Sequence, residues 1–263
     1  MMKYEKNINF YGNKVFFLYP HSVIQNEMII ELIRNEYEIY IISDHEKIIP
    51  ILRKYKDSIL FINIDTILQE DEWEKYIKEI MQNNEIEGTK IGILTYNNDK
   101  ALAEKYLMEI LVPCGFIKLS LGIAASTNII IKVLDANEVK GRRKYVRANC
   151  MNMSMTSFNA KIGEKYYTGK IMNISSAGMS CAFDENVDIE LKTFIPDIQL
   201  KLKGVICKIS GVIGGIRRSE NTTYVILFDK KKSKETRFKI SHFVFKCLQN
   251  AINAELEKII VKK

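Results

Sequence analysis

The sequence has few of the residues from which catalytic and metal-binding sites are built. Its 263 residues include five cysteines, which are widely spaced and form no CxxC pair, so we expect buried thiols and neither a disulfide framework nor a zinc site. The three histidines, His21, His45 and His242, lie in different predicted elements. We find no nucleophile beside a base, no paired carboxylates and no metal cluster. The sequence therefore predicts neither an enzyme nor a bound cofactor.

Long apolar runs are also absent. No run approaches the roughly 18 residues of a membrane-spanning helix, and the N-terminal residues lead into no apolar stretch of signal-peptide length. We therefore expect a cytoplasmic protein that does not insert into membranes. No glycine-rich loop follows the first predicted strand, which argues against a dinucleotide cofactor held on such a loop. Hydrophobic residues make up 47% of the chain, which is enough for two cores of ordinary size.

Positive charge is concentrated in the second half of the chain. Residues 1–138 carry 15 Lys and Arg against 21 Asp and Glu, a net charge of −6, and residues 139–263 carry 24 against 11, a net charge of +13. Such a split favours an anionic partner for the second half. A nucleotide, a nucleic acid or the acidic first half itself could use this field. Lysines that keep a β-barrel soluble would give the same pattern.

The first half alternates short apolar runs with amphipathic segments. Strands are predicted at 15–18, 38–42, 59–64, 91–95 and 116–119, and helices at 22–35, 48–55, 73–81, 102–111 and 124–134. Strand and helix alternation with nearly continuous apolar strands predicts a doubly wound parallel sheet that is covered on both faces. Five such strands resemble the receiver domain of response regulators.

Phosphoryl transfer in such a domain would need acidic side chains that hold magnesium. Asp65 follows the third predicted strand, Thr95 ends the fourth and Lys118 lies in the fifth, but the first strand ends on Tyr-Pro-His at 19–21 and offers no acidic pair. Without carboxylates to hold the metal, the phosphoryl group is not readily neutralised. We therefore expect a receiver-like scaffold that is not phosphorylated, although Asp65, Thr95 and His21 could meet at the carboxyl edge of the sheet.

An arginine motif follows the first half. Arg142, Arg143 and Arg147 lie in a segment, 137–148, that we interpret as a linker with few apolar residues to anchor it. Arginine offers a planar fork of donors that binds phosphate or the O6/N7 edge of guanine with two hydrogen bonds and can stack on a base. The segment is therefore suited to an anionic nucleotide.

A small polar cluster follows one predicted hairpin later. Asn173 and Ser175 are two residues apart, so on a strand they share one face while Met172 and Ile174 take the other. Gly178 then allows a turn, or a close approach of the backbone to a ligand.

Together the two motifs resemble the RxxxR and (D/N)xSxxG motifs of the PilZ domain, the bacterial receptor for the second messenger cyclic di-GMP. The resemblance covers residues from about 140 to 250. It implies that Arg143 and Arg147 bind the phosphates and guanine faces, and that Asn173 and Ser175 form hydrogen bonds with a guanine edge beside Gly178. It also implies that Arg142, just before the motif, favours the binding of a second stacked dinucleotide. An asparagine stands where many members have aspartate, and 224–228 lacks a glycine that the family often has. The implied ligand-binding residues are Arg142, Arg143, Arg147, Asn173, Ser175 and Gly178.

The second half also has the strand pattern of a barrel. A strand is predicted through Met151, Met153 and Met155 up to a turn at Gly163-Glu164, and further strands at 166–175, 179–183, 198–202, 205–213 and 222–228, with Gly214-Gly215 in the last connection. After the lysines at 230–232, Val244, Leu248, Ala251, Ile252 and Ile259 predict a helix that covers an open barrel end. We interpret the lysine triplet as a solvated loop rather than a nucleic-acid site.

These patterns predict an α/β plus β protein. We expect a receiver-like α/β accessory domain at 1–136, an arginine-bearing linker at 137–148, and a six-stranded antiparallel PilZ β-barrel with a C-terminal helix at 149–263. This plan is similar to that of two-domain PilZ proteins of the PlzA type. A degenerate PilZ-like barrel is the alternative for the first domain, in which case its helical periodicity is misleading.

The function that the resemblance implies is a cyclic di-GMP receptor in second-messenger signalling. Binding at the linker would change the domain arrangement and the interaction with an unidentified downstream protein or nucleic acid. The alternative is a nucleic-acid-binding protein that uses the basic half, and binding of the dinucleotide could regulate it. It would need aromatic platforms beside basic residues. The candidates are Tyr145, Phe158, Tyr166 and Tyr167.

Overall fold

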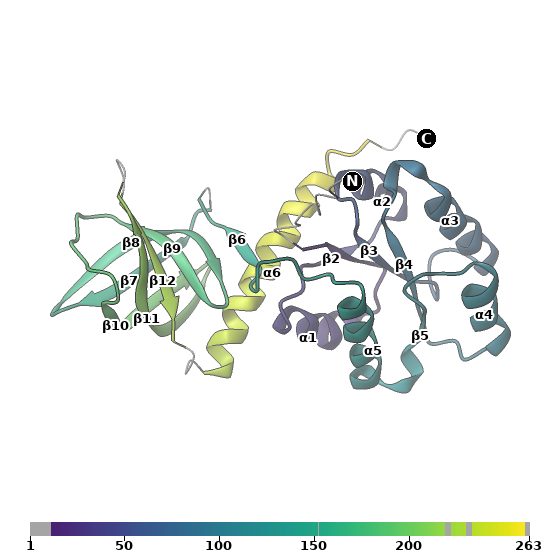
Figure 1. Ribbon diagram of the computed structural model, residues 1–263, viewed down its shortest axis with the longest axis horizontal. Coiled ribbons are helices and arrows are strands. Elements are labelled where there is room, and N and C mark those ends of the chain that lie inside the picture. Colours follow the sequence, from purple (N-terminus) through teal and green to yellow (C-terminus); the bar gives the residue numbers. More distant parts are fainter. Residues whose placement is uncertain (1–11, 152, 219–221, 230–232, 261–263) are drawn as a thin grey trace, which may run out of the picture. The chain divides into compact units, whose positions relative to one another are not determined.

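The computed structural model describes residues 12–151, 153–218, 222–229 and 233–260 (Figure 1). The chain divides into two compact units. The first is formed by the chain up to Lys144 together with the segment from Gln249, and the second is Tyr145–Leu248. The end of the C-terminal helix thus groups with the first unit.

The first unit contains a five-stranded sheet in the order β2-β1-β3-β4-β5. All of its pairings are parallel. The central strands are buried on both faces, as their continuous apolar sequence requires. The strands are β1 (Val15–Leu18), β2 (Ile39–Ile42), β3 (Ile59–Asn63), β4 (Lys90–Thr95) and β5 (Phe116–Lys118).

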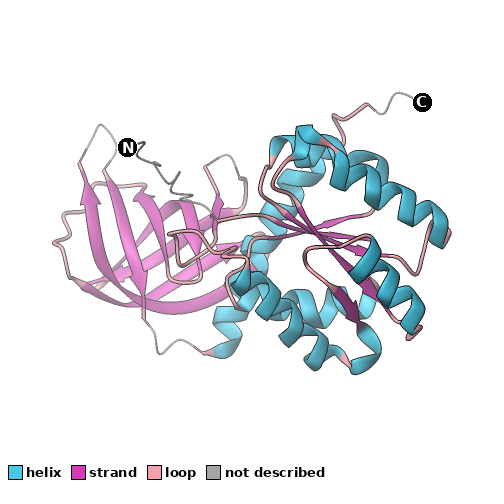
Figure 2. Cartoon of the chain, turned by 45° about the vertical axis from the view of Figure 1, so that its right-hand side comes forward, coloured by secondary structure: helices cyan, strands magenta, loops and turns pink. Residues whose placement is uncertain are grey.

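Helices cover both faces of this sheet (Figure 2). Helices α1 and α5 lie on one face, and α2, α3 and α4 on the other (Figure 1). The amphipathic α3 buries Trp73, Ile77 and Ile80 and begins with a capping box at Gln69 and Glu72. The helices are α1 (Ile29–Arg34), α2 (Ile48–Lys54), α3 (Glu70–Gln82), α4 (Lys100–Glu104) and α5 (Ile123–Ala136), with π-helical turns η1 (Ile24–Met28) and η4 (Lys105–Glu109) and 3₁₀ turns η2 (His45–Lys47), η3 (Asn84–Ile86) and η5 (Leu119–Leu121).

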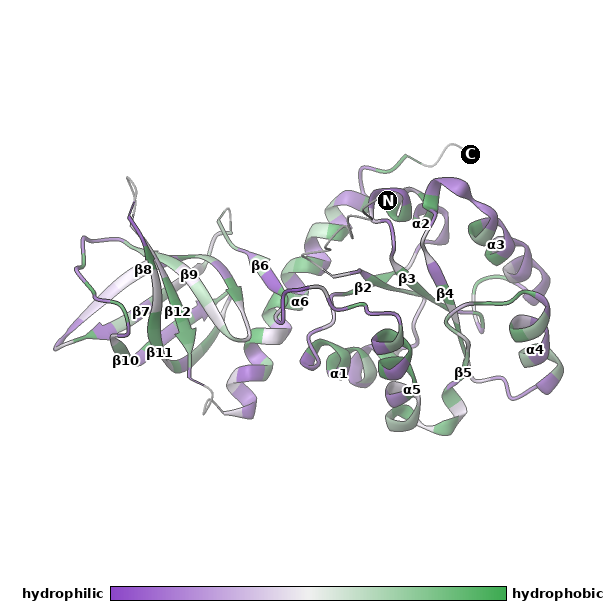
Figure 3. Cartoon of the chain, viewed as in Figure 1, coloured by the Kyte–Doolittle hydropathy of each residue, from purple (hydrophilic) through white to green (hydrophobic). Residues whose placement is uncertain are grey.

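The prediction of a receiver-like, doubly wound domain is confirmed. All five predicted strands are present, and the parallel pairing excludes the alternative of a degenerate barrel in the first half. Hydropathy follows the same plan, since the sheet strands are hydrophobic and the outer faces of the helices hydrophilic (Figure 3). Among the residues described, no helix has the length and apolar character needed to cross a bilayer.

The second unit is a closed antiparallel barrel. Its strands follow the order β8-β7-β10-β11-β12-β9, and β9 pairs with β8 to close the ring, while β6 pairs with the end of β8 beyond its pairing with β7. The predicted six-stranded barrel with a C-terminal helix is therefore confirmed. The strands are β6 (Arg147–Asn149), β7 (Thr156–Ile162), β8 (Lys165–Ser175), β9 (Gly178–Phe183), β10 (Phe194–Leu202), β11 (Val205–Arg217) and β12 (Thr223–Phe228).

Two local predictions in the barrel were wrong. The methionine alternation is no strand: Met151 and Met155 are 65% and 74% exposed, and the backbone turns there, with Met153 N bonded to Cys150 O and Met155 at a φ of 62°. Gly214 and Gly215 do not connect two strands, because β11 runs through them to Arg217 and forms a bulge there against β12. The predicted lysine loop at 230–232 lies outside the described residues.

Helix α6 (Lys234–Leu256) contributes to both units. Ile240, Phe243, Val244 and Cys247 belong to the barrel core and Leu248 packs against it, as predicted for Val244 and Leu248. Ala251, Ile252 and Ile259, which were predicted to cover the barrel end with them, group with the first unit. From Gln249 onward the helix belongs to the first unit, where the Gln249 side chain accepts a hydrogen bond from Ile41 N and donates one to Ile41 O, both at 2.8 Å. This amide pairs with the free edge of β2 as a neighbouring strand would.

Candidate functional site

The two motifs come together in the strand pair β6–β8. Arg147 is directly opposite Ser175, and Asn149 is opposite Asn173. Between them, Ala148 and Ile174 point into the barrel core, where both are buried. Directly opposed residues of an antiparallel pair project from the same face, so Arg147 and the motif serine share the outer face of the barrel.

Strands β9 and β12 extend this face beyond the predicted residues. Asn173 is opposite Ser180, which is opposite Val225, and Ser175 is opposite Gly178, which is opposite Leu227. The side chains of Val225 and Leu227 are 39% and 52% exposed. The outer face therefore continues from polar residues to an apolar strip. Sequence reasoning missed Asn149, Ser180 and both apolar residues, and only the period of two from Arg147 to Asn149 could have indicated one of them.

Ser175 is used by the turn that it begins. It is 5% exposed, and its hydroxyl donates to Gly178 O at 3.2 Å and accepts from Ala177 N at 3.3 Å. The hydroxyl therefore fixes the connection between β8 and β9 in its present shape.

Gly178 is required by a close approach of two strands rather than by an unusual φ. A Cβ atom at this position would lie 2.5 Å from the carbonyl oxygen of Ile226 in β12. Any larger residue would therefore force β9 and β12 apart at the edge of the candidate site.

A bulge in β8 modifies the predicted alternation. The register between β8 and β9 shifts between Ile171 and Asn173, so both Ile171 and Ile174 are buried in the core. Met172 was predicted to share a face with Ile174, but the bulge displaces it from the core. It is half-buried, and its sulfur accepts from the hydroxyl of Thr223 at 3.6 Å. Asn173 and Ser175 keep their predicted common face.

The predicted linker is anchored over its first part. Val139 is buried, its carbonyl accepts from Asn13 N at 2.8 Å, and Lys140 Nζ lies 4.2 Å from the centre of the Tyr37 ring. Val139 is therefore one of the few apolar residues that anchor this segment. Arg142 and Arg143 follow as exposed residues outside helix and strand, at the end of the first unit.

The carboxyl edge of the parallel sheet holds a closed hydrogen-bond network. Thr95 Oγ1 donates to Asp65 Oδ1, Tyr96 N donates to Asp65 Oδ2 at 2.8 Å, and His21 Nε2 lies 3.3 Å from the same oxygen. Asp65, Thr95 and His21 thus meet as predicted. Lys118 does not join them, because its amine reaches Asn98 O at 3.5 Å. Both carboxylate oxygens of Asp65 are already occupied by donors.

The aromatic residues proposed as base platforms have different positions. Phe158 is 1% exposed and belongs to the barrel core, so it is not available as a base platform. Tyr167 is half-buried with its ring 6.3 Å from that of Phe183. Tyr166 is 54% exposed, with its hydroxyl bonded to Asp197 at 3.2 Å and Lys161 near its ring.

Comparisons with known proteins give two groups of solved structures. No protein-family model and no curated protein matches the sequence. The PilZ domain of YcgR from Escherichia coli, in a structure with c-di-GMP, is 11% identical over 45% of this chain and 99% of its own, with a TM-score of 0.38. The MrkH–c-di-GMP complex of K. pneumonia is 16% identical over 46% of this chain and 57% of its own, with a TM-score of 0.37.

The second group consists of receiver domains. The signal receiver domain of an HD domain-containing protein from Pseudomonas fluorescens Pf-5 is 13% identical over 49% of this chain and 99% of its own, with a TM-score of 0.39. This chain matches little more than half of the MrkH chain in that complex.

Proposed function

We propose that this protein is a receptor for cyclic di-GMP, which binds on the outer face of the barrel at β6, β8 and β9. The observation that carries the proposal is the register of β6 on β8. It places Arg147 opposite Ser175, and Asn149 opposite Asn173. Two motifs that are 26 residues apart in the sequence become one surface by this pairing alone.

The chemistry of this surface suits a guanine dinucleotide. Arg147 is exposed and forms no ion pair with any residue that the structure describes, so its guanidinium can take a phosphate without breaking another contact. Arg143, four residues earlier, supplies the second guanidinium. The Asn173 amide can both donate to and accept from a guanine edge. Exposed Val225 and Leu227 offer an apolar surface of the kind that a flat purine covers.

In this proposal Ser175 shapes the site and does not contact the ligand directly. Because its hydroxyl holds the turn to Gly178, it shapes the surface on which the base lies. Arg142 is proposed to assist a second, stacked dinucleotide, since its guanidinium adds a further stacking and phosphate-binding group next to Arg143.

Signal transmission is proposed to depend on the short segment 141–146. The residues before it are anchored through Val139, whereas this segment carries Arg142, Arg143 and Lys144 in succession. Ligand phosphates would neutralise the mutual repulsion of these charges and fasten the segment to the barrel. A downstream protein or nucleic acid would then read the ordered form. We propose binding and not catalysis as the activity, and the first unit as an accessory domain.

The direct test is a calorimetric titration of the whole chain with cyclic di-GMP, with cyclic di-AMP as the control. Both ligands carry two phosphates, so electrostatic attraction alone would bind them alike. The proposal predicts saturable binding of the guanine ligand and much weaker binding of the adenine ligand. Equal binding of the two, or none, would contradict it.

Nucleic-acid binding remains the second candidate, favoured by the outer face of β10, β7 and β8. Lys201, Ser157 and Lys170 are neighbours there in adjacent strands, and exposed Tyr166 supplies an aromatic ring beside Lys161. A cyclic di-GMP titration in the presence of excess single-stranded RNA separates the two functions. Unchanged dinucleotide affinity indicates two surfaces, and competition indicates a shared one.

A further inference from the structure

Three sulfur atoms from separate elements gather beside the end of β6. Cys150 follows β6, Met153 lies in the turn that precedes β7, and Cys247 comes from α6. The Cys247 and Met153 sulfurs are 3.6 Å apart. Both cysteines are at most 3% exposed, and Cys150 is close enough to Cys247 for the charge of one thiolate to act on the other.

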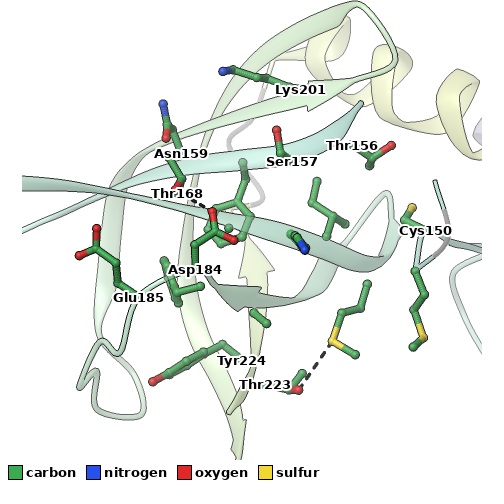
Figure 4. Close-up of a pocket in the computed structure, with 18 of the residues that line it drawn as sticks. Cys150, Thr156, Ser157, Asn159, Thr168, Asp184, Glu185, Lys201, Thr223 and Tyr224 are labelled. Atoms are coloured by element: carbon green, nitrogen blue, oxygen red, sulfur yellow. Dashed lines mark hydrogen bonds between the residues drawn. The ribbon is translucent and has the colours of Figure 1, made fainter. Parts of the chain in front are cut away.

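Two methionines near this cluster, Met151 and Met155, lie outside the barrel core, whereas Met153 packs against it. Met151 and Met155 flank Met153 with one residue between each, and they are 65% and 74% exposed in a turn that needs no apolar side chains. All three methionines and Cys150 line a cavity of about 1120 Å³ on the barrel unit. Figure 4 shows Cys150 with its sulfur at the wall of this cavity. The cavity therefore borders the sulfur cluster on the side of Cys150 and Met153.

The donor set points to one class of ligand. Thiolate and thioether sulfurs select Cu(I) among the biological metals, whereas calcium and magnesium require oxygen ligands. In the part of the chain that is described, no three His, Cys, Asp or Glu side chains are grouped to hold a metal ion, so a borderline metal such as zinc lacks its usual donors. Metal–sulfur bonds of about 2.3 Å in a trigonal site would put the sulfurs about 4 Å apart, close to the distance observed for one pair.

A positive charge lies near the cluster. Lys203 is close enough to act electrostatically on both Cys150 and Cys247. Its charge would offset the net negative charge of one Cu(I) held by two thiolates.

We propose that Cys150, Met153 and Cys247 form a binding site for one soft monovalent cation, Cu(I) or its analogue Ag(I). The metal forms bonds to two thiolates and one thioether, and the two thiol protons leave to solvent, so no electron is transferred. Met151 and Met155 act as exposed thioethers that bring the ion to the cavity. This site is separate from the proposed dinucleotide site and does not depend on it.

The test is an anaerobic titration of the reduced protein with Cu(I) against bathocuproine disulfonate as a coloured competitor. The proposal predicts one Cu(I) per chain retained against the competitor. Cys150→Ser and Cys247→Ser should each abolish this retention, and Met153→Leu, which keeps the side-chain volume, should weaken affinity about 10-fold or more. Cys114→Ser and Cys207→Ser, at buried cysteines outside the cluster, are the matched controls and should retain the ion.

Circular dichroism of each variant shows whether it is folded. Met153→Leu is the decisive variant if a cysteine variant unfolds, because methionine and leucine exchange at little cost in a core. No retained Cu(I) in the wild-type protein, or equal retention in Met153→Leu and both folded cysteine variants, would overturn the proposal.

Discussion

Replacing Arg147 by alanine removes the guanidinium at the centre of the proposed site. The side chain is exposed at the first residue of β6, while Ala148 beside it carries the burial of that strand. Surface substitutions of this kind change stability by no more than about 0.5 kcal/mol. Each charge-assisted hydrogen bond to a phosphate contributes about 1.5–3 kcal/mol, so the loss of one or more should weaken cyclic di-GMP binding by about 10- to 100-fold or beyond.

The assay is isothermal calorimetry of Arg147→Ala beside urea unfolding of the same sample. Arg237→Ala is the matched control, since Arg237 is an exposed arginine of the same unit on α6 and lies outside the motifs. We expect the control to bind as the wild-type protein does. Arg143→Ala should resemble Arg147→Ala, and Asn173→Ala should lose less because its hydrogen bonds are neutral. Wild-type affinity in Arg147→Ala with unchanged stability would refute the assignment of the site.

Three further predictions concern the two units separately. Gly178→Ala should destabilise the barrel by about 1–3 kcal/mol in urea unfolding, because its Cβ meets Ile226 O, whereas Gly215→Ala should be tolerated since its Cβ meets only ordinary contacts; equal midpoints would contradict this. Burial, with the charge of Lys246, lowers the pKa of His242, so the unfolded chain binds more protons and stability should fall as pH drops below about 6.5; His242→Gln should reduce this dependence. Acetyl phosphate with magnesium should add no mass to the intact protein, because both Asp65 oxygens are occupied and no acidic pair holds the metal; a phosphate that disappears in Asp65→Ala would oppose this.

The elements of the first unit could be predicted because their burial is written in local patterns. A strand buried on both faces is nearly continuously apolar, as 59–62 is, and a helix such as 70–82 shows its buried face through its period. The edge contact of Gln249 with Ile41 could not be predicted. It joins residues 208 positions apart, and a polar residue in a helix carries no sign of the strand that it will meet.

In the second unit, alternation identified β8 and the common face of Asn173 and Ser175. It failed at 151–155, where methionines alternate with polar residues but the backbone turns, and at 214–215, where glycines mark a bulge and not a loop. Strand β6 was missed because it has only three residues, two of them polar, which is too short for a periodic signal. Its register on β8, which brings Arg147 to Ser175, is a tertiary property that the motifs imply only through their family resemblance.

The most direct test of the central claim is to determine which residues of the barrel the ligand contacts. Backbone amide chemical shifts measured by heteronuclear NMR, with and without cyclic di-GMP, locate the contact residue by residue. The account predicts the largest changes at 147–149, 173–180 and 225–227, which are joined by the register of β6, β8, β9 and β12. Changes confined to β7 and β10, at 157–161 and 199–201, or no changes at saturating ligand, would contradict it.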